Sequence, residues 1–547
     1  MTNALSTGTK AKFGDARLRS RLLKLGVLLV AIAAFAGLTV LTFLAMAGHP
    51  NDWARWPTTF ELHYVDNPFL WLIARDVVEG QPVEFWSSGQ DFLFPAFLIS
   101  LASYLITSGD IHWYYVVVAA LNNAALFTLI FAIARHVDRA SGFWRQLTLT
   151  FAASLPLLVG TFSGASLVFV LHLAPNYNFD LDVGILLAAL ILLARTTASR
   201  VTFSVLFVFV AASNLLTILF TVPVAVIVLA LKYFRSGVAA VHRSGIWFVA
   251  TVAAALGLNA VLFRLPHPDL PFSIRSNQTK SYVDFGSVGE RMNTVVAQFQ
   301  TAAAGNLIMI FATMCVVTSL IAAIVAIRRY FRDASAGDVQ LGRVFLLLFP
   351  VVGAAAAYAV TLLYDWYLWP LIVGSQVVCL LLLIPRRARL AVAAIGTAGV
   401  LVFTLGGGNL ARSADTYFAV RAPGVACVDD HVASDSVIYA KNFNGKIVAS
   451  QTTKHIRVIQ LYRGWTVAEW LNNVAEASEY HGEIHEILLD TPGPGADADA
   501  ADYMADARAA FGEPDEKITC AADAGTERRF ELWRYERNIN ITSGARP

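Results

Sequence analysis

Long apolar runs alternate with short polar segments over the first 409 residues of the chain. A helix that spans a bilayer needs about 20 consecutive apolar residues. Runs near this length lie at 25–46, 114–134, 146–170, 179–196, 201–212, 215–231, 245–263, 304–326, 344–363, 367–385 and 390–408. The two runs within 201–231 are short, and Ala212-Ser213-Asn214 predicts the turn between them. The pattern predicts a mainly α fold, a polytopic bundle of about 11 transmembrane helices.

Composition agrees with this pattern, because 56% of the residues are hydrophobic and only 15% are charged. A soluble domain carries about 25% charged residues, so a large soluble enzyme is excluded. Lys and Arg are grouped at the ends of apolar runs and do not form a basic face of the kind that binds nucleic acid. The expected environment is membrane lipid, and nucleic acid is not an expected partner.

The predicted loops differ sharply in their content of Lys and Arg. The side that includes the basic N-terminus, 1–24, holds 21 of these residues, whereas the loops 48–111 and 264–303 on the other side hold six. The positive-inside rule makes the first side cytoplasmic. A full span at 93–107 would reverse every later loop, so we interpret it as an interfacial or re-entrant helix in the first external loop, 48–111. The run at 25–46 is too long for the core of a signal peptide and predicts an uncleaved span.

The pattern changes in the last part of the chain, 410–547, which this topology places outside. Short β-rich runs at 436–440, 446–449, 486–490 and 529–533 alternate with helix-like stretches at 466–478 and 500–510. We therefore predict a transmembrane domain over 25–409 and a small extracytoplasmic α/β domain over 410–547. Cys427 and Cys520 flank most of this domain and are a candidate disulfide if it faces an oxidising compartment, although spacing alone does not establish that they are close.

The first external loop contains the first candidate for chemistry. Asp66 precedes Asn67-Pro68 and an amphipathic segment that continues to Arg75. One interpretation is structural, because Asp or Asn ahead of Pro is a favourable helix start. The other is a carboxylate that acts as a general base.

Further candidates lie on the same predicted side of the membrane. His172, Asp180 and Asp182 flank the start of a span, where they form either a site for a divalent cation or a hydrogen-bonded interfacial turn. Arg264, Arg275 and Lys280 lie on the predicted external side, which is otherwise poor in Lys and Arg. Their positive charges indicate a binding site for an anion such as phosphate. Tyr367 lies in an aromatic segment, 364–370, that is typical of interfacial anchors. P-loop, HExxH, CxxC and GxSxG patterns do not occur, so ATP-driven pumping and serine hydrolysis have no support.

The order of these features resembles a known class. A basic N-terminus and one span are followed by an acidic residue ahead of Leu70-Trp-Leu-Ile-Ala-Arg75 and then by a Pro-led helix, Phe92-Leu-Phe-Pro95. Asp180 and Asp182 then open a later span. Over roughly 25–408 the chain resembles the polytopic glycosyltransferases of the GT-C class, which include aminoarabinose transferases of lipid A and protein mannosyltransferases.

The resemblance implies a function and residue roles. The enzyme would move a sugar from a polyprenyl-phosphate donor to an envelope glycan, lipid or protein at the periplasmic face of a bacterial inner membrane, with its N-terminus cytoplasmic. Asp66 matches the general base, and Asp180 or Asp182 matches a second acidic position, with Mg, Mn or Zn as possible cofactor. The residues implied in substrate binding are Arg264, Arg275, Lys280 and Tyr367.

The chain departs from the class pattern at two positions. Asn67 follows Asp66 where many members have paired acids, and Ser213 stands where many have Lys. Two other hypotheses about the function therefore stay open. A transporter or flippase of lipid-linked sugars predicts charged groups at mid-membrane and internal repeats. An inactive scaffold that presents the external domain for envelope assembly predicts that changes at Asp66 are silent.

Overall fold

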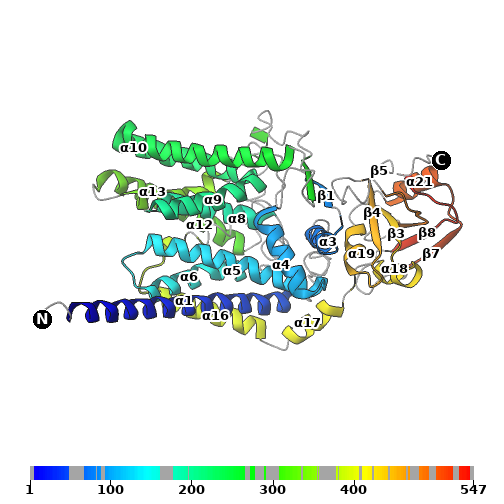
Figure 1. Ribbon diagram of the computed structural model, residues 1–547, viewed down its shortest axis with the longest axis horizontal. Helices are drawn as coiled ribbons and strands as arrows, with labels where there is room; N and C mark the ends of the chain where they lie inside the picture. Colours follow the sequence, from blue (N-terminus) through cyan, green and yellow to red (C-terminus); the bar gives the residue numbers. More distant parts are fainter. Residues whose placement is uncertain are drawn as a thin grey trace.

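The computed structural model places the bundle and the C-terminal domain at opposite ends of an elongated molecule (Figure 1). It describes residues 5–47, 67–81, 83–87, 93–159, 177–194, 196–264, 272–276, 289–290, 293, 307–333, 337–353, 355, 377, 379, 381–405, 409–419, 421, 424–441, 444–462, 466–467, 480–491, 500–520 and 529–541.

The bundle consists of helices that lie along the long axis of the molecule (Figure 1). Helix α1 packs on α5, α5 packs on α6 and α8, and α8 packs on α9. Phe35, Phe127, Phe179 and Phe207 are fully buried in one continuous apolar core. The bounds are α1 Leu5–Ala47, α5 Ile111–Val137, α6 Phe143–Val159, α8 Tyr177–Leu193, α9 Thr197–Ser213, α10 Leu216–Arg264, α12 Leu307–Arg332, α13 Asp338–Leu348 and α16 Arg389–Leu405.

Several of these helices have the length and composition of membrane spans. Within the described residues, five stretches qualify: Leu18–Ala45, Ile111–Val137, Leu216–Ala239, Gly245–Leu262 and Met314–Arg332. Large apolar side chains such as Leu29, Val249 and Ile321 are exposed on their outer faces, as expected for helices that contact lipid. The predicted polytopic helical fold is confirmed. The predicted number of spans is not tested, because parts of 146–170, 344–363 and 367–385 lie outside the described residues.

Two local predictions for the bundle agree with the structure. Helix α9 ends at Ser213 and α10 begins at Leu216, so the short turn lies where the sequence places it. Helix α4 (Leu98–Thr107) has ten residues, about 15 Å at 1.5 Å per residue. That is half the apolar thickness of a bilayer, so the short helix predicted at 93–107 is present, and its interfacial or re-entrant position stays a prediction.

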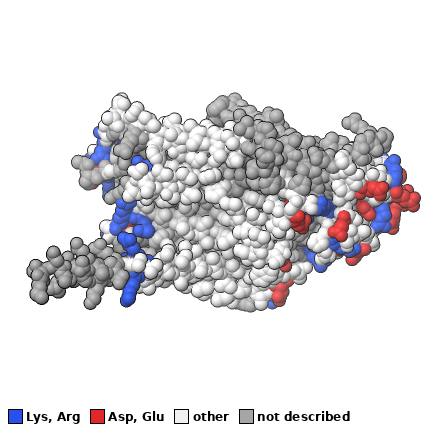
Figure 2. Space-filling model, in the orientation of Figure 1, with Lys and Arg blue, Asp and Glu red and all other residues white. Residues whose placement is uncertain are grey.

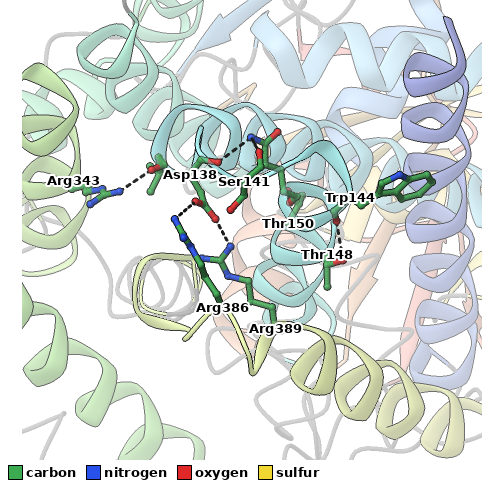
Figure 3. Close-up of polar contacts among 10 residues, drawn as sticks. Asp138, Ser141, Trp144, Thr148, Thr150, Arg343, Arg386 and Arg389 are labelled. Atoms are coloured by element: carbon green, nitrogen blue, oxygen red, sulfur yellow. Dashed lines mark hydrogen bonds and ion pairs between the residues drawn. The ribbon is translucent and has the colours of Figure 1, made fainter. Parts of the chain in front are cut away.

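Lys and Arg form a band at the end of the bundle opposite the C-terminal domain (Figure 2). We call this end, which includes Arg343, Arg386 and Arg389, the basic end, and the opposite end the domain end. Asp138, directly after α5, pairs with Arg389 and, at 3.1 Å, with Arg386 (Figure 3). Arg343 donates a hydrogen bond of 2.7 Å to the carbonyl of Val137. These contacts tie three separate segments together at the basic end.

The C-terminal domain is built on a mixed sheet with the strand order β5-β4-β3-β6-β8-β7. Strand β3 is parallel to β4 and β6, and the other pairs are antiparallel. The strands are β3 Val437–Lys441, β4 Arg457–Tyr462, β5 Thr466–Val467, β6 Glu486–Asp490, β7 Glu516–Thr519 and β8 Phe530–Arg534. The accompanying helices are α18 Val425–His431, α19 Asn444–Gln451 and α21 Ala500–Phe511. The predicted α/β domain is confirmed.

Alternating side chains give this sheet an apolar core on each face. Tyr439 and Trp533 are buried in one cluster, whereas their strand neighbours Ile438 and Leu532 are buried in the other. Successive residues of a strand point to opposite faces, so both faces are covered. The helix α17 (Asn409–Ala419) instead packs along α1.

Two sequence predictions for this domain are wrong. Residues 446–449, predicted as a strand, lie in α19, and Thr466–Val467, predicted to begin a helix, form β5. A short apolar run carries no periodicity that separates a strand from a turn of buried helix. The rest of the helix predicted over 466–478 lies outside the described residues.

The predicted pairing of Cys427 with Cys520 is present as a disulfide between residues 93 apart in sequence. It joins α18 to the end of β7. A cross-link closing a loop of this length restricts the unfolded chain and typically contributes about 4 kcal/mol. We expect Cys427→Ser with Cys520→Ser to lower the unfolding temperature of the domain, measured by calorimetry on the full chain. Reductant should shift wild type toward this variant and leave the variant unchanged; an effect of reductant on both would contradict the assignment.

Candidate active site

Helix α3 (Asn67–Val78) begins directly after Asp66. Asp66 itself lies outside the described residues, so its role stays a prediction. The helix has one apolar face, where Leu70 and Ile73 pack against Val83 and Ala96. Its place at the domain end is therefore set by burial of that face between the bundle and the C-terminal domain (Figure 1).

Hydrogen bonds fix α3 to the neighbouring turn and helix. The indole nitrogen of Trp71 donates to the carbonyl of Gly109 at 3.1 Å, and the hydroxyl of Ser100 donates to the carbonyl of Leu70 at 3.0 Å. Buried hydrogen bonds hold geometry because breaking them leaves a polar group without water. These two bonds hold the first turns of α3 against α4 and the turn at Gly109.

Helix α3 contains an ion pair between neighbouring residues. Arg75 and Asp76 are 2.9 Å apart, and the side chain of Asp76 is almost fully buried. The guanidinium of Arg75 also lies 5.8 Å from the centroid of the Trp71 ring. Adjacent opposite charges on an amphipathic helix are the only sequence signal for such a pair. Because Asp76 balances its charge, Arg75 serves the structure of α3.

The segment η1 (Leu93–Phe97) packs against the turn between α9 and α10. The amide of Phe94 donates to the hydroxyl of Ser213 at 3.1 Å. In the turn, Asn214 accepts from the amide of Leu216 through its side-chain oxygen. Ser213, at the position where the GT-C resemblance leads us to expect Lys, therefore connects the first loop to the helical hairpin.

Asp180 is completely buried in the first turn of α8, beside η1. The backbone of Ala96 interacts with its carboxyl group, but neither carboxyl oxygen has a hydrogen-bond partner of normal geometry within the described residues. A carboxylate removed from water without full compensation is costly. Such groups within membrane helices usually mark a functional site.

A second buried polar group, the hydroxyl of Thr217 on α10, packs against α8 at Gly184. Gly184 is four residues after Asp180, on the same face of the helix, and it contacts Thr217 of α10. The hydroxyl of Thr217 is fully buried and has no hydrogen-bond partner within the described part of the chain. Asp180 and Thr217 are thus two buried polar side chains of the α8–α10 region without hydrogen-bond partners of normal geometry among the described residues. Thr217 could not be singled out from the sequence, because Thr is common in membrane helices.

Close packing of α8 on α10 leaves no room for a side chain at Gly184, where an added Cβ would overlap the methyl group of Thr217. We expect Gly184→Ala to destabilise the bundle by about 2 kcal/mol through overpacking. Gly257→Ala on α10 is the matched control, because no atom lies within 4 Å of a Cβ added there. Thermal unfolding in nanodiscs measures both, and equal stability of the two variants would contradict the packing assignment.

The predicted cation ligands do not converge in the described structure. Asp180 and Asp182 are two residues apart on α8, and such residues do not share a helix face. His172 lies outside the described residues, and among those that are described no cluster of three or more His, Cys, Asp and Glu side chains is suited to a metal ion.

The structure joins the first loop to the second. Strand β1 (Val83–Ser87) pairs in parallel with β2 (Phe272–Ser276), and Trp86 lies opposite Arg275 in the register. Arg264 is the last residue of α10. Lys280 and Tyr367 lie outside the described residues. Of the four predicted substrate-binding residues, Arg275 thus lies on β2, the strand that pairs with β1 of the first loop.

No protein-family profile matches the sequence, and no curated protein matches it. The fold is similar to that of ArnT from Cupriavidus metallidurans, in a crystal structure bound to undecaprenyl phosphate. The two share 12% sequence identity with a TM-score of 0.50, over 95% of this chain and 99% of that chain. At this identity the similarity shows the fold alone. The chain has a polytopic helical fold similar to that of ArnT, with a C-terminal domain.

Proposed function

We propose that the protein is a membrane glycosyltransferase. It moves a sugar from a polyprenyl-phosphate donor to an envelope glycan, lipid or protein. The observation that carries the proposal is the convergence of α3, the buried carboxyl group of Asp180 and the β1–β2 pair at the domain end of the bundle. The similar fold of ArnT, whose structure holds undecaprenyl phosphate, supports the choice of donor.

Transfer of a sugar requires two kinds of group. Asp66 accepts the proton of the acceptor hydroxyl as its oxygen attacks the anomeric carbon. The bond from that carbon to the phosphate oxygen breaks, and the polyprenyl phosphate leaves with the electron pair. Positive side chains stabilise the departing phosphate, and we assign this role to Arg264, Arg275 and Lys280. The pairing of β1 with β2 supports Arg275 in particular, because it ties the two loops together.

Other groups bind the substrates in this proposal. We assign Tyr367 to contact with the donor, and we assign the buried carboxyl group of Asp180 to the second acidic position of the site. Asp180 or Asp182, together with His172, stays a candidate ligand set for Mg, Mn or Zn, with no step assigned to the ion.

We place the basic end in the cytoplasm and the domain end in the periplasm of a bacterial inner membrane. The concentration of Lys and Arg at the basic end supports this orientation through the positive-inside rule. The disulfide between Cys427 and Cys520 supports an oxidising compartment for the C-terminal domain.

A turnover assay tests the proposed function. The purified protein in nanodiscs is incubated with a panel of polyprenyl-phosphate sugars and an envelope fraction as acceptor, and released polyprenyl phosphate is measured. We expect release with one class of donor. Intact donor that crosses the bilayer of proteoliposomes without release would favour the flippase. The absence of both release and transport would favour the scaffold.

A further inference from the structure

The C-terminal domain contacts the bundle beside α3 through a buried lysine. Lys446 lies on α19, is 1% exposed, and its ammonium lies 4.7 Å from the centroid of the Phe69 ring on α3. Helices α19 and α3 pack against each other at the junction between domain and bundle (Figure 1). Phe69 is in the first turn of α3, three residues after Asp66 in the sequence.

The position of Lys446 follows from how α19 packs in its own domain. Gly445 fits closely against the side chains of Val458 and Gln460 on β4, and Val448 is buried in the core of the domain. Residues two apart on a helix point in different directions, so Lys446 is turned away from Val448 and reaches α3. The sheet therefore supplies a rigid base for this lysine.

A charged side chain at this buried position is costly if its only role is to fill space. Removing an ammonium from water is costly, and an apolar residue of similar size usually serves stability as well or better. A desolvated contact between a cation and a ring returns part of this cost. Lys446 makes at least one further interaction besides that with Phe69.

A series of contacts connects Phe69 to the buried carboxyl group of Asp180 in the bundle. Phe69 packs against the cluster that contains Leu70, Ile73 and Ala96, and the backbone of Ala96 interacts with Asp180. The first turn of α3 is thus held between Lys446 on the domain side and η1 on the bundle side.

We propose that Lys446 is a positioning residue that the C-terminal domain supplies to the active site. Its charge holds the first turn of α3, which directly follows Asp66 in the sequence. The role in catalysis rests on the proposed glycosyltransferase function, whereas the anchoring of α3 does not.

The test uses the full chain in nanodiscs with Lys446→Met, which keeps the length of the side chain and removes its charge, and with Lys446→Arg, which keeps the charge. Lys454→Met is the matched control, because Lys454 lies in the same domain and its ammonium donates to the carbonyl of Val432 in that domain. Hydrogen exchange of the α3 amides reports anchoring, and kcat and KM for the donor report catalysis.

We expect Lys446→Met to speed exchange in α3 about tenfold and to lower kcat about 100-fold, because small displacements of catalytic groups have effects of this size. The KM should change little, Lys446→Arg should restore most of both losses, and Lys454→Met should match wild type. Wild-type exchange in Lys446→Met would overturn the proposal. Faster exchange with unchanged kcat, or equal losses in Lys446→Arg and Lys446→Met, would assign Lys446 to packing alone and overturn it too.

If wild type shows no turnover with any donor, the proposed function fails, and exchange alone decides whether Lys446 anchors α3. Phe69→Leu provides an independent check, because it removes the ring face and keeps an apolar side chain. Its effect on exchange should not add to that of Lys446→Met, and full additivity would contradict a shared contact.

Discussion

Asp66→Asn is expected to lower the rate of sugar transfer about 10³-fold. An amide cannot accept the acceptor proton, and loss of a general base typically costs 10²- to 10⁴-fold. The amide has nearly the same shape as the carboxyl group and is able to accept the same capping hydrogen bonds, so the unfolding temperature should change little. The measurement is the release of polyprenyl phosphate at saturating donor, with thermal unfolding of the same samples.

Glu79→Gln is the matched control for this prediction, because Glu79 lies in the same loop and its side chain is exposed. It should retain wild-type turnover. Equal turnover in wild type and Asp66→Asn would remove Asp66 from the reaction and leave it as a helix cap. Equal losses in both variants would point to a general effect of negative charge in this loop.

Asp138→Asn is expected to destabilise the bundle by about 3 kcal/mol. The side chain of Asp138 is 7% exposed and that of its partner Arg389 is 11% exposed, so the variant leaves a nearly buried guanidinium without a counter-charge, a loss that usually costs 3–5 kcal/mol. Arg386 is 60% exposed and contributes less. Thermal unfolding in nanodiscs is the measurement, and Asp333→Asn, an exposed carboxylate near the same end, is the control.

The same contacts predict a pH dependence. Burial acts to raise the pKa of Asp138, but the hydrogen bond and charge of Arg389 and the charge of Arg386 outweigh it and lower the pKa below its ordinary value. The stabilisation is therefore complete above about pH 4, the ordinary carboxyl pKa, and is lost as the pH falls through the lower folded value. Asp138→Asn should remove this part of the acid dependence. An unchanged acid profile would contradict the ion pair.

The sequence predicts the large features of the fold because they depend on composition over long windows. Runs of about 20 apolar residues identify membrane helices by length alone, and grouped Lys and Arg identify the loops that gather at one end. The turn at Ser213 and the short helix over 98–107 follow from the same pattern. The sequence leaves open whether Cys427 and Cys520 form a disulfide, because only the fold determines whether the two residues are close in space.

Contacts between distant segments were not predictable in this way. The helical segment over 446–449 is too short for its hydrophobic pattern to show a helical period. What makes it a helix is packing on a sheet whose strands lie elsewhere in the sequence. Lys446 in isolation is an ordinary charged residue, and only the docking of α19 on α3 makes it a buried one. Thr217 gains its importance from Gly184 on another helix. Sequence patterns find elements, whereas a site made by packing elements together requires their arrangement.

Photo-crosslinking decides whether a lipid-linked donor binds at the domain end. A photoreactive undecaprenyl phosphate is added to the protein in nanodiscs, irradiated, and located by peptide mapping, with unlabelled undecaprenyl phosphate as competitor. We predict competable labels in α3, in η1, at the start of α8 and on β2. Labels confined to the basic end, or spread over the lipid-facing helices and insensitive to competitor, would contradict a donor site at the domain end.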